Sequence, residues 1–355
     1  MDKYFLPSIV AKNSNTDYWE TSPKYGRGNP KYISEGDAHD WWIWHDEYPF
    51  EHLQEKVPRF MSEFGFQSFP SFETVKYINQ KDEIDLKTDA IKSHQKHPKG
   101  FELIEKYMKR DYKIPTSDED YVYVSQLLQA KGIVMGIEAQ RRAKPYNMGT
   151  LYWQLNDCWP AISWSSIDYF GNWKALQYKA KKAFENVLIS TVKSKNGYEI
   201  YIVNDLLLET KGTLQIKIMD FFGKEIWSDT SRITVKADAS QRVYQLLKTD
   251  VDHTKHFLSV TFNNSSSFFY FAKPKDLMLP KEPIERTISK TKNGFSITLK
   301  SNVLQKDVFL FTSEKGHFSD NFFDLLPNTS KTIHFKSNST NLQQLSIKSL
   351  QSIQE

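Results

Sequence analysis

Glu63 is the first residue of this chain whose surroundings suggest chemistry. It stands in the largely apolar run RFMSEFGF at 59–66. If this run is a strand, side-chain alternation places Glu63 and Met61 on a polar, open face and the phenylalanines on the face toward the core. A carboxylate on a largely buried strand is costly unless it is paired or hydrogen-bonded. From the pattern alone, a structural ion pair is a commoner reason for such a residue than catalysis.

A second cluster lies at 149–160, where the run GTLYWQLNDCWP ends a predicted strand. It combines two indoles with hydrogen-bonding side chains, in Trp153, Asn156, Asp157 and Trp159. Sugar-binding sites are built from such residues, because flat apolar sugar faces stack on aromatic rings while hydroxyl groups take directional hydrogen bonds. Either tryptophan taken alone would more commonly pack between a strand and a helix. The combination favours a carbohydrate site.

A third cluster, GDAHDWWIWHD at 36–46, holds three tryptophans, two histidines and three aspartates in eleven residues. Metal binding is one interpretation of this composition. However, His39 and His45 are six residues apart, which is not a regular spacing for metal ligands. A loop rich in tryptophan is more typical of carbohydrate binding than of zinc binding. We therefore expect neither a metal nor another cofactor.

The overall composition argues against several classes of partner. The 47 basic and 43 acidic residues are mixed along the chain, so the net charge of +4 creates no single-sign field that would attract nucleic acid or anionic lipid. No run of about 18 apolar residues occurs, and no signal-peptide core follows Met1. The one cysteine, Cys158, excludes an intrachain disulfide framework. We expect no nucleic-acid or membrane partner, and the sequence leaves the compartment open.

Up to residue 184, short apolar runs alternate with helical patterns, as βα units require. A helix is predicted over 117–143, because Ser117 is a good N-cap and is followed by an acidic first turn. The other elements predicted here are strands at 16–20, 59–66 and 148–155 and a helix at 173–184. Counted generously, this half holds four strands, whereas a closed parallel (β/α)8 TIM barrel needs eight. We therefore expect residues 1–184 to form part of such a barrel.

After residue 185 the pattern changes to the period-2 alternation that is typical of β-sandwiches. Alternating strands are predicted at 198–203, 214–218, 233–235, 295–299, 308–311 and 332–335. Pro274, Pro280 and Pro283 interrupt the series. The fold class is therefore α/β plus all-β, with two small sandwiches at 185–275 and 276–355.

Three stretches resemble glycoside hydrolase family 2 β-mannosidases. They are the Gly-Asp-x-His-x-Trp segment at 36–41, RFMSEFGFQSFP at 59–70 and MGTLYWQLNDCWPAISWSSIDYFGNWKALQYKAKKAF at 148–184. The run GHFSDNFFDLLP at 316–327 resembles the C-terminal immunoglobulin-like domain of the same family. The resemblance covers nearly the whole chain. It implies the C-terminal half of the catalytic TIM barrel, strands 5 to 8, followed by two immunoglobulin-like β-sandwich domains.

The resemblance also implies a reaction, the retaining hydrolysis of terminal non-reducing β-D-mannose residues in oligosaccharides. In this mechanism one carboxylate attacks the anomeric carbon, and a second carboxyl protonates the leaving oxygen and then activates water. Glu63 matches the position of the nucleophile, and Trp153 matches an aromatic residue that lines the subsite for the terminal mannose. The other residues expected at or near this pocket are His39, Trp41, Trp44, Asn156, Asp157 and Trp159. The first three belong to the loop beside the pocket, and the last three shape its rim or support its lining.

The sequence departs from the family pattern in one important respect. The acid/base glutamate of the family follows an asparagine, and no Asn-Glu dipeptide occurs in this sequence. The match begins at FLPSIV, residues 5–10, which resembles the segment just before the fifth barrel strand. We therefore expect the chain to lack the acid/base and to be inactive alone. A truncated gene, a mis-called start and one piece of a split enzyme remain alternatives; in the last case the partner is an N-terminal half of the same enzyme.

Other functions remain open beside the β-mannosidase interpretation. One is a non-catalytic remnant that keeps the tryptophans and still binds carbohydrate, and another is a defective fragment with no ligand. Within the same family, β-galactosidase and β-glucuronidase are alternatives, which the mannosidase-like run WQLNDCWP at 153–160 disfavours. Family members occur in lysosomes, in the bacterial periplasm and in the cytosol, so the resemblance does not assign a compartment.

Overall fold

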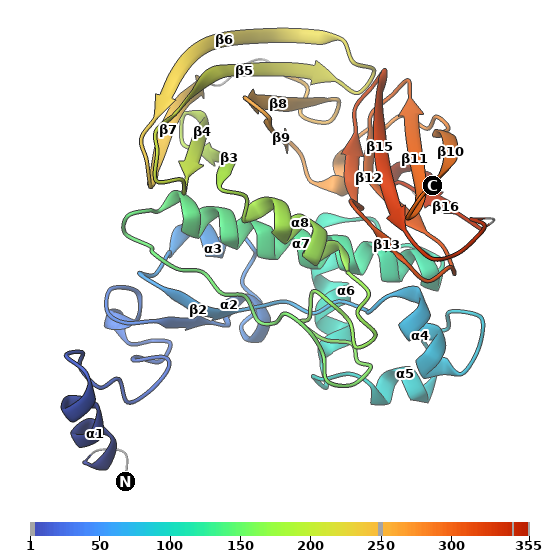
Figure 1. Ribbon diagram of the computed structural model, residues 1–355. Helices are drawn as coiled ribbons and strands as arrows, with labels where there is room; N and C mark the ends of the chain where they lie inside the picture. The colour runs from blue at the N-terminus through green and yellow to red at the C-terminus, as the bar shows by residue number, and fades with distance from the viewer. Residues whose placement is uncertain (1–3, 248–250, 343, 354–355) are drawn as a thin grey trace.

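The computed structural model describes residues 4–247, 251–342 and 344–353. Its N-terminal part is built from helices and short parallel strands, and its C-terminal part from antiparallel sheets (Figure 1). Helix α7 (Asp118–Arg142) lies between the two parts, with α8 (Ala175–Ala183) beside it (Figure 1). This mixed architecture confirms the coarse prediction of an α/β part followed by β domains.

The helices of the N-terminal part begin at residues that satisfy their free N–H groups. Ser117 accepts a hydrogen bond from the Asp120 N–H at the start of α7, as predicted, and Ser71 and Thr88 cap α4 and α5 in the same way. The other helices are α1 (Phe5–Asn13), α2 (Trp42–His45), α3 (His52–Glu55), α4 (Phe72–Asn79), α5 (Asp89–Ser93) and α6 (Gly100–Asp111), with a 3-10 turn η1 at Pro30–Ile33. Both predicted helices, at 117–143 and 173–184, are therefore confirmed to within two residues at each end.

Two short parallel strands carry the candidate nucleophile. Strand β1 (Ala38–Asp40) pairs with β2 (Met61–Phe64), and Thr150 forms a parallel bridge with Met61 on the other side of β2. Helix α7 packs closely behind β2, because Gly136 leaves room for the Phe64 ring; a Cβ at Gly136 would lie 2.6 Å from that ring. β2 is thus held between two parallel neighbours and a buried helix.

Two of the predicted strands differ from the structure. Residues 16–20 form no strand, and Trp19 lies 49% exposed beside Gly36 and Lys24. A strand needs a neighbour to receive its ladder hydrogen bonds, and none of the described residues provides one here. The predicted strand at 148–155 is reduced to the single bridge at Thr150, although the Met61 N–H donates to Gly149 and the Leu151 N–H donates to Met61. The described parallel sheet is therefore open, not closed.

The first β domain consists of two antiparallel sheets whose inner faces form one core. One sheet has the order β3 (Val187–Ser194), β4 (Gly197–Asn204), β7 (Ala239–Leu247), and the other has the order β6 (Glu225–Val235), β5 (Thr210–Asp220), β8 (His256–Phe262), β9 (Ser265–Tyr270). Alternation along β5 buries Leu214, Ile216 and Ile218 and exposes the residues between them or leaves them half-buried, as the period-2 pattern predicts.

The second β domain is smaller and packs against the helices. One sheet has the order β10 (Glu285–Thr291), β11 (Gly294–Ser301), β15 (Thr329–Lys336), β13 (His317–Phe318), and the other has the order β14 (Phe323–Leu325), β12 (Gln305–Phe311), β16 (Ser346–Lys348). A short 3-10 turn, η2 (Pro274–Asp276), precedes this domain, and a second, η3 (Leu350–Ser352), follows its last strand. The Tyr123 hydroxyl of α7 donates to the Asp307 carbonyl at 2.6 Å, and the Phe309 ring lies 5.7 Å from the Tyr123 ring. The domain is therefore anchored on the helix that supports β2.

None of the helices within the described ranges is long and apolar enough to cross a lipid bilayer.

Candidate active site

Glu63 lies near the C-terminal end of β2 and is held through one oxygen. Its Oε2 atom accepts a hydrogen bond from the Trp41 indole N–H at 3.1 Å and lies 2.9 Å from Nδ1 of His39. The carboxylate side chain is 17% exposed. Among the residues that the structure describes, neither a lysine nor an arginine forms an ion pair with it. Both contacts therefore converge on Oε2.

An irregularity in the parallel pair aims His39 at Glu63. The register pairs Ala38 with Met61 but His39 with Glu63, so Ser62 is an extra residue on β2. The Ser62 hydroxyl reaches the Asp37 carboxylate at 2.7 Å and the Ala38 carbonyl at 3.2 Å. Such bulges re-aim side chains next to functional sites. The irregularity also differs from the simple alternation expected from sequence, which placed Met61 and Glu63 on one open face. Met61 is fully buried, whereas Glu63, two residues later, is partly exposed.

Trp153 is brought next to the strand that carries Glu63. Its backbone N–H donates to the Phe64 carbonyl at 2.7 Å, and its side chain is 44% exposed. Gly65 permits this approach, because a Cβ at Gly65 would lie 2.2 Å from the Trp153 carbonyl oxygen. The backbone of Trp153 is thus fixed beside Phe64, the residue that follows Glu63, and its indole is partly exposed. The convergence of the Glu63 and Trp153 side chains on one sugar pocket stays a prediction.

Trp164, His45 and His97 extend the aromatic surface beyond Trp41. From sequence, His45 was weighed only as a metal ligand, and Trp164 and His97 were not identified. The Trp164 ring lies 6.0 Å from the Trp41 ring, and the His45 ring lies 5.7 Å from the rings of both Trp41 and His97. Burial lowers the pKa of His45 and of His97, so both imidazoles favour the neutral form. Trp164 lies inside the family-like stretch at 148–184, so the density of aromatic residues there was the signal available.

Trp44 does not line this surface, which corrects the expectation from sequence. Its side chain is completely buried, with ring contacts to Phe66, His97 and Trp164 at about 5 to 5.5 Å. The short helix α2 explains the difference, since Trp41 caps its start while Ile43 and Trp44 turn into the core. Trp44 therefore supports the cluster from behind and cannot touch a ligand.

Asn156, Asp157 and Trp159 lie in the loop that follows Trp153. Asp157 is buried, with its carboxylate 2.6 Å from the Lys96 ammonium and 2.6 Å from the Ser163 hydroxyl. The Trp159 ring packs 5.3 Å from the His94 ring, and Asn156 is exposed. None of the contacts described for these three residues reaches Glu63. Their observed contacts fix the loop, and a role at the rim of the pocket stays a prediction.

The chain offers no metal centre within its described residues, since no group of three or more His, Cys, Asp or Glu side chains is placed to hold an ion.

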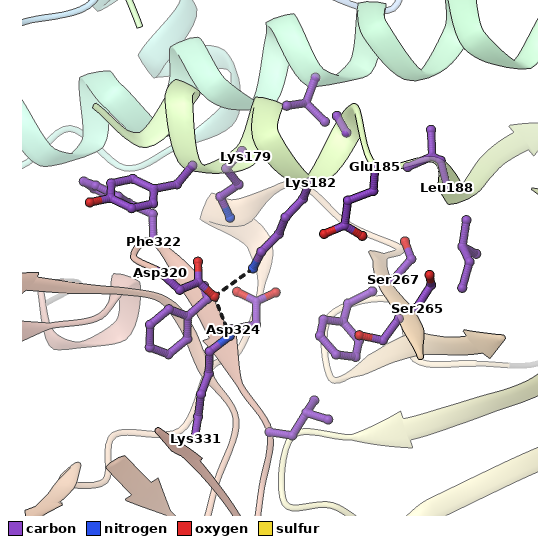
Figure 2. Close-up of a pocket in the computed structure, with 18 of the residues that line it drawn as sticks. Lys179, Lys182, Glu185, Leu188, Ser265, Ser267, Asp320, Phe322, Asp324 and Lys331 are labelled. Atoms are coloured by element: carbon purple, nitrogen blue, oxygen red, sulfur yellow. Dashed lines mark hydrogen bonds and ion pairs between the residues drawn. The ribbon is translucent and has the colours of Figure 1, made fainter. Parts of the chain in front are cut away.

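The largest cavity described lies away from this site. Its volume is about 570 Å³, and it is bounded by α8, β3, β9 and the loop that ends in β14 (Figure 2). Figure 2 shows Lys182 and Lys331 reaching Asp320, at 3.1 and 2.6 Å. Burial alone would raise the pKa of Asp320, but these two lysines hold it below its usual value. Asp320 is thus engaged by both lysines, and we interpret the cavity as a gap between packed domains. Glu63 does not line it.

Comparison with known proteins agrees with the predicted β domains. Residues 196–276 match a family described as a mannosidase Ig/CBM-like domain, and residues 279–353 match an Ig-fold domain of mannosidases. A β-mannosidase of Capra hircus is 29% identical over 343 residues, covering 86% of this chain and 38% of the relative. β-Mannosidase B of Aspergillus terreus is 28% identical over 244 residues, covering 62% of this chain and 29% of the relative.

Among solved structures, the crystal structure of a β-D-mannosidase from Dictyoglomus thermophilum superposes with a TM-score of 0.87 at 29% identity. It covers 98% of this chain and 44% of that one. The resemblance to the C-terminal part of family 2 β-mannosidases is confirmed. An exo-chitosanase of Amycolatopsis orientalis, at 16% identity and a TM-score of 0.66 over 88% of this chain and 44% of that one, shares the fold. The chain spans about two fifths of the length of the β-mannosidases from Capra hircus and Dictyoglomus thermophilum.

Proposed function

We propose that this chain forms the nucleophile-bearing part of a retaining β-mannosidase that releases terminal non-reducing β-D-mannose from oligosaccharides. One observation carries the proposal: the Glu63 carboxylate stands at the end of a parallel strand with Oε2 engaged by His39 and Trp41. A carboxylate fixed through one oxygen presents the other in a defined direction, as an attack on an anomeric carbon requires.

In this mechanism Oε1 of Glu63 forms a bond to the anomeric carbon while the bond from that carbon to the leaving oxygen breaks. The leaving oxygen takes its proton from a second carboxyl group, which then removes a proton from the water that hydrolyses the glycosyl ester. The two carboxyl groups of retaining enzymes stand about 5–5.5 Å apart. The acid/base has no counterpart in the family-like segments of this sequence, so we assign it to polypeptide outside these 355 residues.

The substrate contacts of the proposal come from three of the residues predicted from sequence. Trp153 offers a partly exposed indole face for the apolar side of the terminal mannose. Trp41 and His39 hold the nucleophile and border the same surface. Asn156 and Trp159 are assigned to the rim, and Asp157 fixes the loop that carries them.

The finer architecture belongs to the same proposal. Residues 1–184 form the C-terminal half of a (β/α)8 TIM barrel, 185–275 an immunoglobulin-like β-sandwich and 276–355 a second one. The parallel pair of β1 and β2, the parallel bridge at Thr150 and the backing helix α7 support the half-barrel. The two matched Ig-type segments support the sandwiches.

The proposed partner is a polypeptide that carries the remaining barrel strands. Its docking surface includes the open side of the segment at 151–155, which lies beside β2 and whose Leu151 and Leu155 side chains are 56% and 55% exposed. Large apolar side chains at the open side of a parallel sheet are typical of a face that is covered in the complete fold.

The test is covalent labelling by a dinitrophenyl 2-deoxy-2-fluoro-β-mannoside, whose activated leaving group needs no acid. We expect no adduct on the chain alone, because in this proposal the remaining barrel strands supply part of the groups that position the substrate. Adding the polypeptide with the remaining strands should give one adduct, mapped to Glu63 by peptide mass, and Glu63→Gln should abolish it. Labelling at another carboxylate would refute the assignment. Mannoside binding without any labelling in the completed protein would instead favour a non-catalytic carbohydrate-binding remnant.

A further inference from the structure

The loop between β4 and β5 carries three consecutive leucines at the surface of the first β domain. Leu206, Leu207 and Leu208 are 38%, 88% and 77% exposed. Single apolar residues on a surface are ordinary, whereas a contiguous exposed group commonly marks a place where another protein binds. The mechanism proposed for Glu63 uses none of these residues. The three leucines are therefore a candidate docking surface.

The shape of this loop is fixed from inside the domain. Asn204 is completely buried, and its side-chain amide donates to the carbonyls of Leu208 and Lys236 at 2.9 and 3.0 Å. Its Oδ1 atom accepts the Leu206 N–H at 3.1 Å, and the Leu206 carbonyl accepts the Asp238 N–H at 2.9 Å. Turning the leucines inward would break these bonds and leave the buried amide of Asn204 without partners. The loop therefore presents its leucines in a preorganised form, which lowers the entropic cost of binding.

The charges beside the loop neutralise one another. The Asp205 carboxylate lies 2.9 Å from Arg141 and 2.9 Å from Lys144, and Lys144 also contacts Asp238. Two cations thus face two carboxylates at this end of the domain. An occupant of the leucines therefore needs no charge of its own, and an apolar segment fits best.

The loop stands at the rim of a hollow that reaches the segment beside β2. The hollow has a volume of about 180 Å³, and its lining includes Asp205, Phe184 and the residues at 148–150. Phe184 and Met148 are 42% and 56% exposed, so they add exposed apolar surface beside the loop. Met148, Phe184 and residues 206–208 together are called the leucine patch below.

The direction of the strands indicates what lies against the leucine patch. Thr150 pairs in parallel with Met61 of β2, so the segment at 148–151 begins at Met148, beside the patch. None of the described residues forms a strand on the other side of this segment. The strands of a parallel barrel all begin at one end of the barrel. A strand that completes the sheet beside Thr150 must therefore begin next to the leucine patch, and the chain that leads into it must cross the patch.

We propose that the leucine patch binds the apolar segment that leads into this completing strand, carried by the polypeptide of the proposed function. The inference rests on that function, because it takes the added barrel strand from it. The β-mannosidases of Capra hircus and Dictyoglomus thermophilum are long enough to hold such a partner, since this chain covers 38% and 44% of them. The first β domain thereby takes part in closing the barrel, and the contact with the partner extends from the open side of 151–155 to the loop between β4 and β5.

The first experiment is photo-cross-linking, with the photoreactive residue p-benzoylphenylalanine in place of Leu207 in the full chain. The probe is the N-terminal part of the Dictyoglomus thermophilum β-D-mannosidase, outside the 44% of that protein that superposes on this chain. We expect one cross-link, mapped by peptide mass to the residues just before the first barrel strand of the probe. The matched control carries the same residue in place of Phe222, which is 62% exposed beyond the other end of β5, and should give no cross-link. A cross-link to another part of the probe, to a second copy of this chain, or equally from both positions overturns the proposal.

The second measurement is the affinity of the chain for the same probe, by titration calorimetry. Leu207→Ser should weaken binding about 10- to 100-fold, because the burial of one leucine side chain has an effect of that size. Leu207 is 88% exposed, so the urea midpoint of the chain alone should not change, which separates lost binding from unfolding. Phe222→Ser is the control and should bind as the parent does. Equal affinities of Leu207→Ser and the parent, or no complex with the unsubstituted chain, overturn the proposal.

The docking surface and the proposed function fail in different ways. If the complex forms and position 207 gives the expected cross-link, but the fluoromannoside does not label Glu63, the proposed function fails and the docking surface stands. If Glu63 is labelled in the complex while position 207 gives no cross-link, the docking surface fails and the proposed function stands.

Discussion

Gly65 gives the sharpest test of how the site is assembled, because its missing side chain is what admits Trp153. In Gly65→Ala the new Cβ would lie 2.2 Å from the Trp153 carbonyl oxygen and 3.0 Å from Cδ1 of Trp164. Carbon and oxygen atoms in contact normally stand about 3.3–3.6 Å apart. The Trp153 backbone must therefore retreat by about 1 Å. It cannot do so freely, since its N–H is bonded to the Phe64 carbonyl at 2.7 Å.

Two effects of Gly65→Ala can be sized from this geometry. Overpacking of this kind destabilises a core by about 1–3 kcal/mol. With a urea dependence of about 3 kcal/mol per molar, the unfolding midpoint should fall by about 0.3–1 M. In the completed enzyme, displacing Trp153 by about 1 Å should lower the rate of Glu63 labelling about 10²-fold.

The stability assay is urea unfolding followed by tryptophan fluorescence. Eight of the nine tryptophans precede residue 174, so the signal reports on the part of the chain that contains the site. Gly26→Ala is the matched control, because a Cβ at Gly26 has nothing within 4 Å. Gly149→Ala is a second control, for which we expect a smaller effect than for Gly65→Ala. Its Cβ would meet the Phe60 ring at 2.1 Å, but that ring is 38% exposed and free to turn away. If Gly65→Ala unfolds at the same midpoint as Gly26→Ala and is labelled as fast as the parent, the close approach does not hold Trp153 in place.

Two further predictions concern the charges that hold the helices. Lys174 is completely buried, with Nζ 3.4 Å from the carbonyls of Ser68 and Ser163, and burial lowers its pKa from 10.5 to about 7. The unfolded chain keeps the proton up to about pH 10.5, so the free energy of unfolding should rise with pH from about 7 upward. Lys174→Met should flatten that slope and raise the urea midpoint at pH 7, whereas the exposed control Lys92→Met should change neither. Arg141 donates to the carbonyls of Ala183 and Glu185 and to the partly exposed Asp205, so Arg141→Met should cost about 1–3 kcal/mol in the same assay, chiefly by leaving the two carbonyls without a donor. The control here is Arg232→Met on the exposed side of β6, and equal midpoints for the two would contradict the role of Arg141.

The regular elements were predictable because their signals are local. The N-cap at Ser117 and the acidic turn after it define the start of α7 whatever packs around the helix. Alternation along β5 likewise requires only one buried face. The prediction of a strand at 16–20 is wrong because strand formation depends on a distant partner and not on a local signal. An extended segment becomes a strand only when a neighbour accepts its hydrogen bonds, and a neighbour is not visible in the pattern of five residues.

The site was predictable as a set of segments but not as a geometry. The clusters at 36–46 and 59–66 meet at Glu63, and the backbone of the cluster at 149–160 reaches Phe64 beside it. The extra residue Ser62 could not be foreseen, because a bulge shifts every later side chain by one face without changing the composition. Trp44 was misassigned because the sequence did not predict the short helix α2. This helix turns the Trp44 side chain into the core, while Trp41, three positions earlier, remains at the surface.

The proposed roles of the two halves of such an enzyme follow from how each catalytic group is held. The nucleophile needs a fixed oxygen, and here Trp41 and His39 hold Oε2 of Glu63 from within the same chain. The acid/base needs a fixed distance from that oxygen, which only the closure of the barrel can set. A chain with the first property and without the second can be ordered at Glu63 and still be inactive. For the same reason, we expect labelling of Glu63 to wait for the partner.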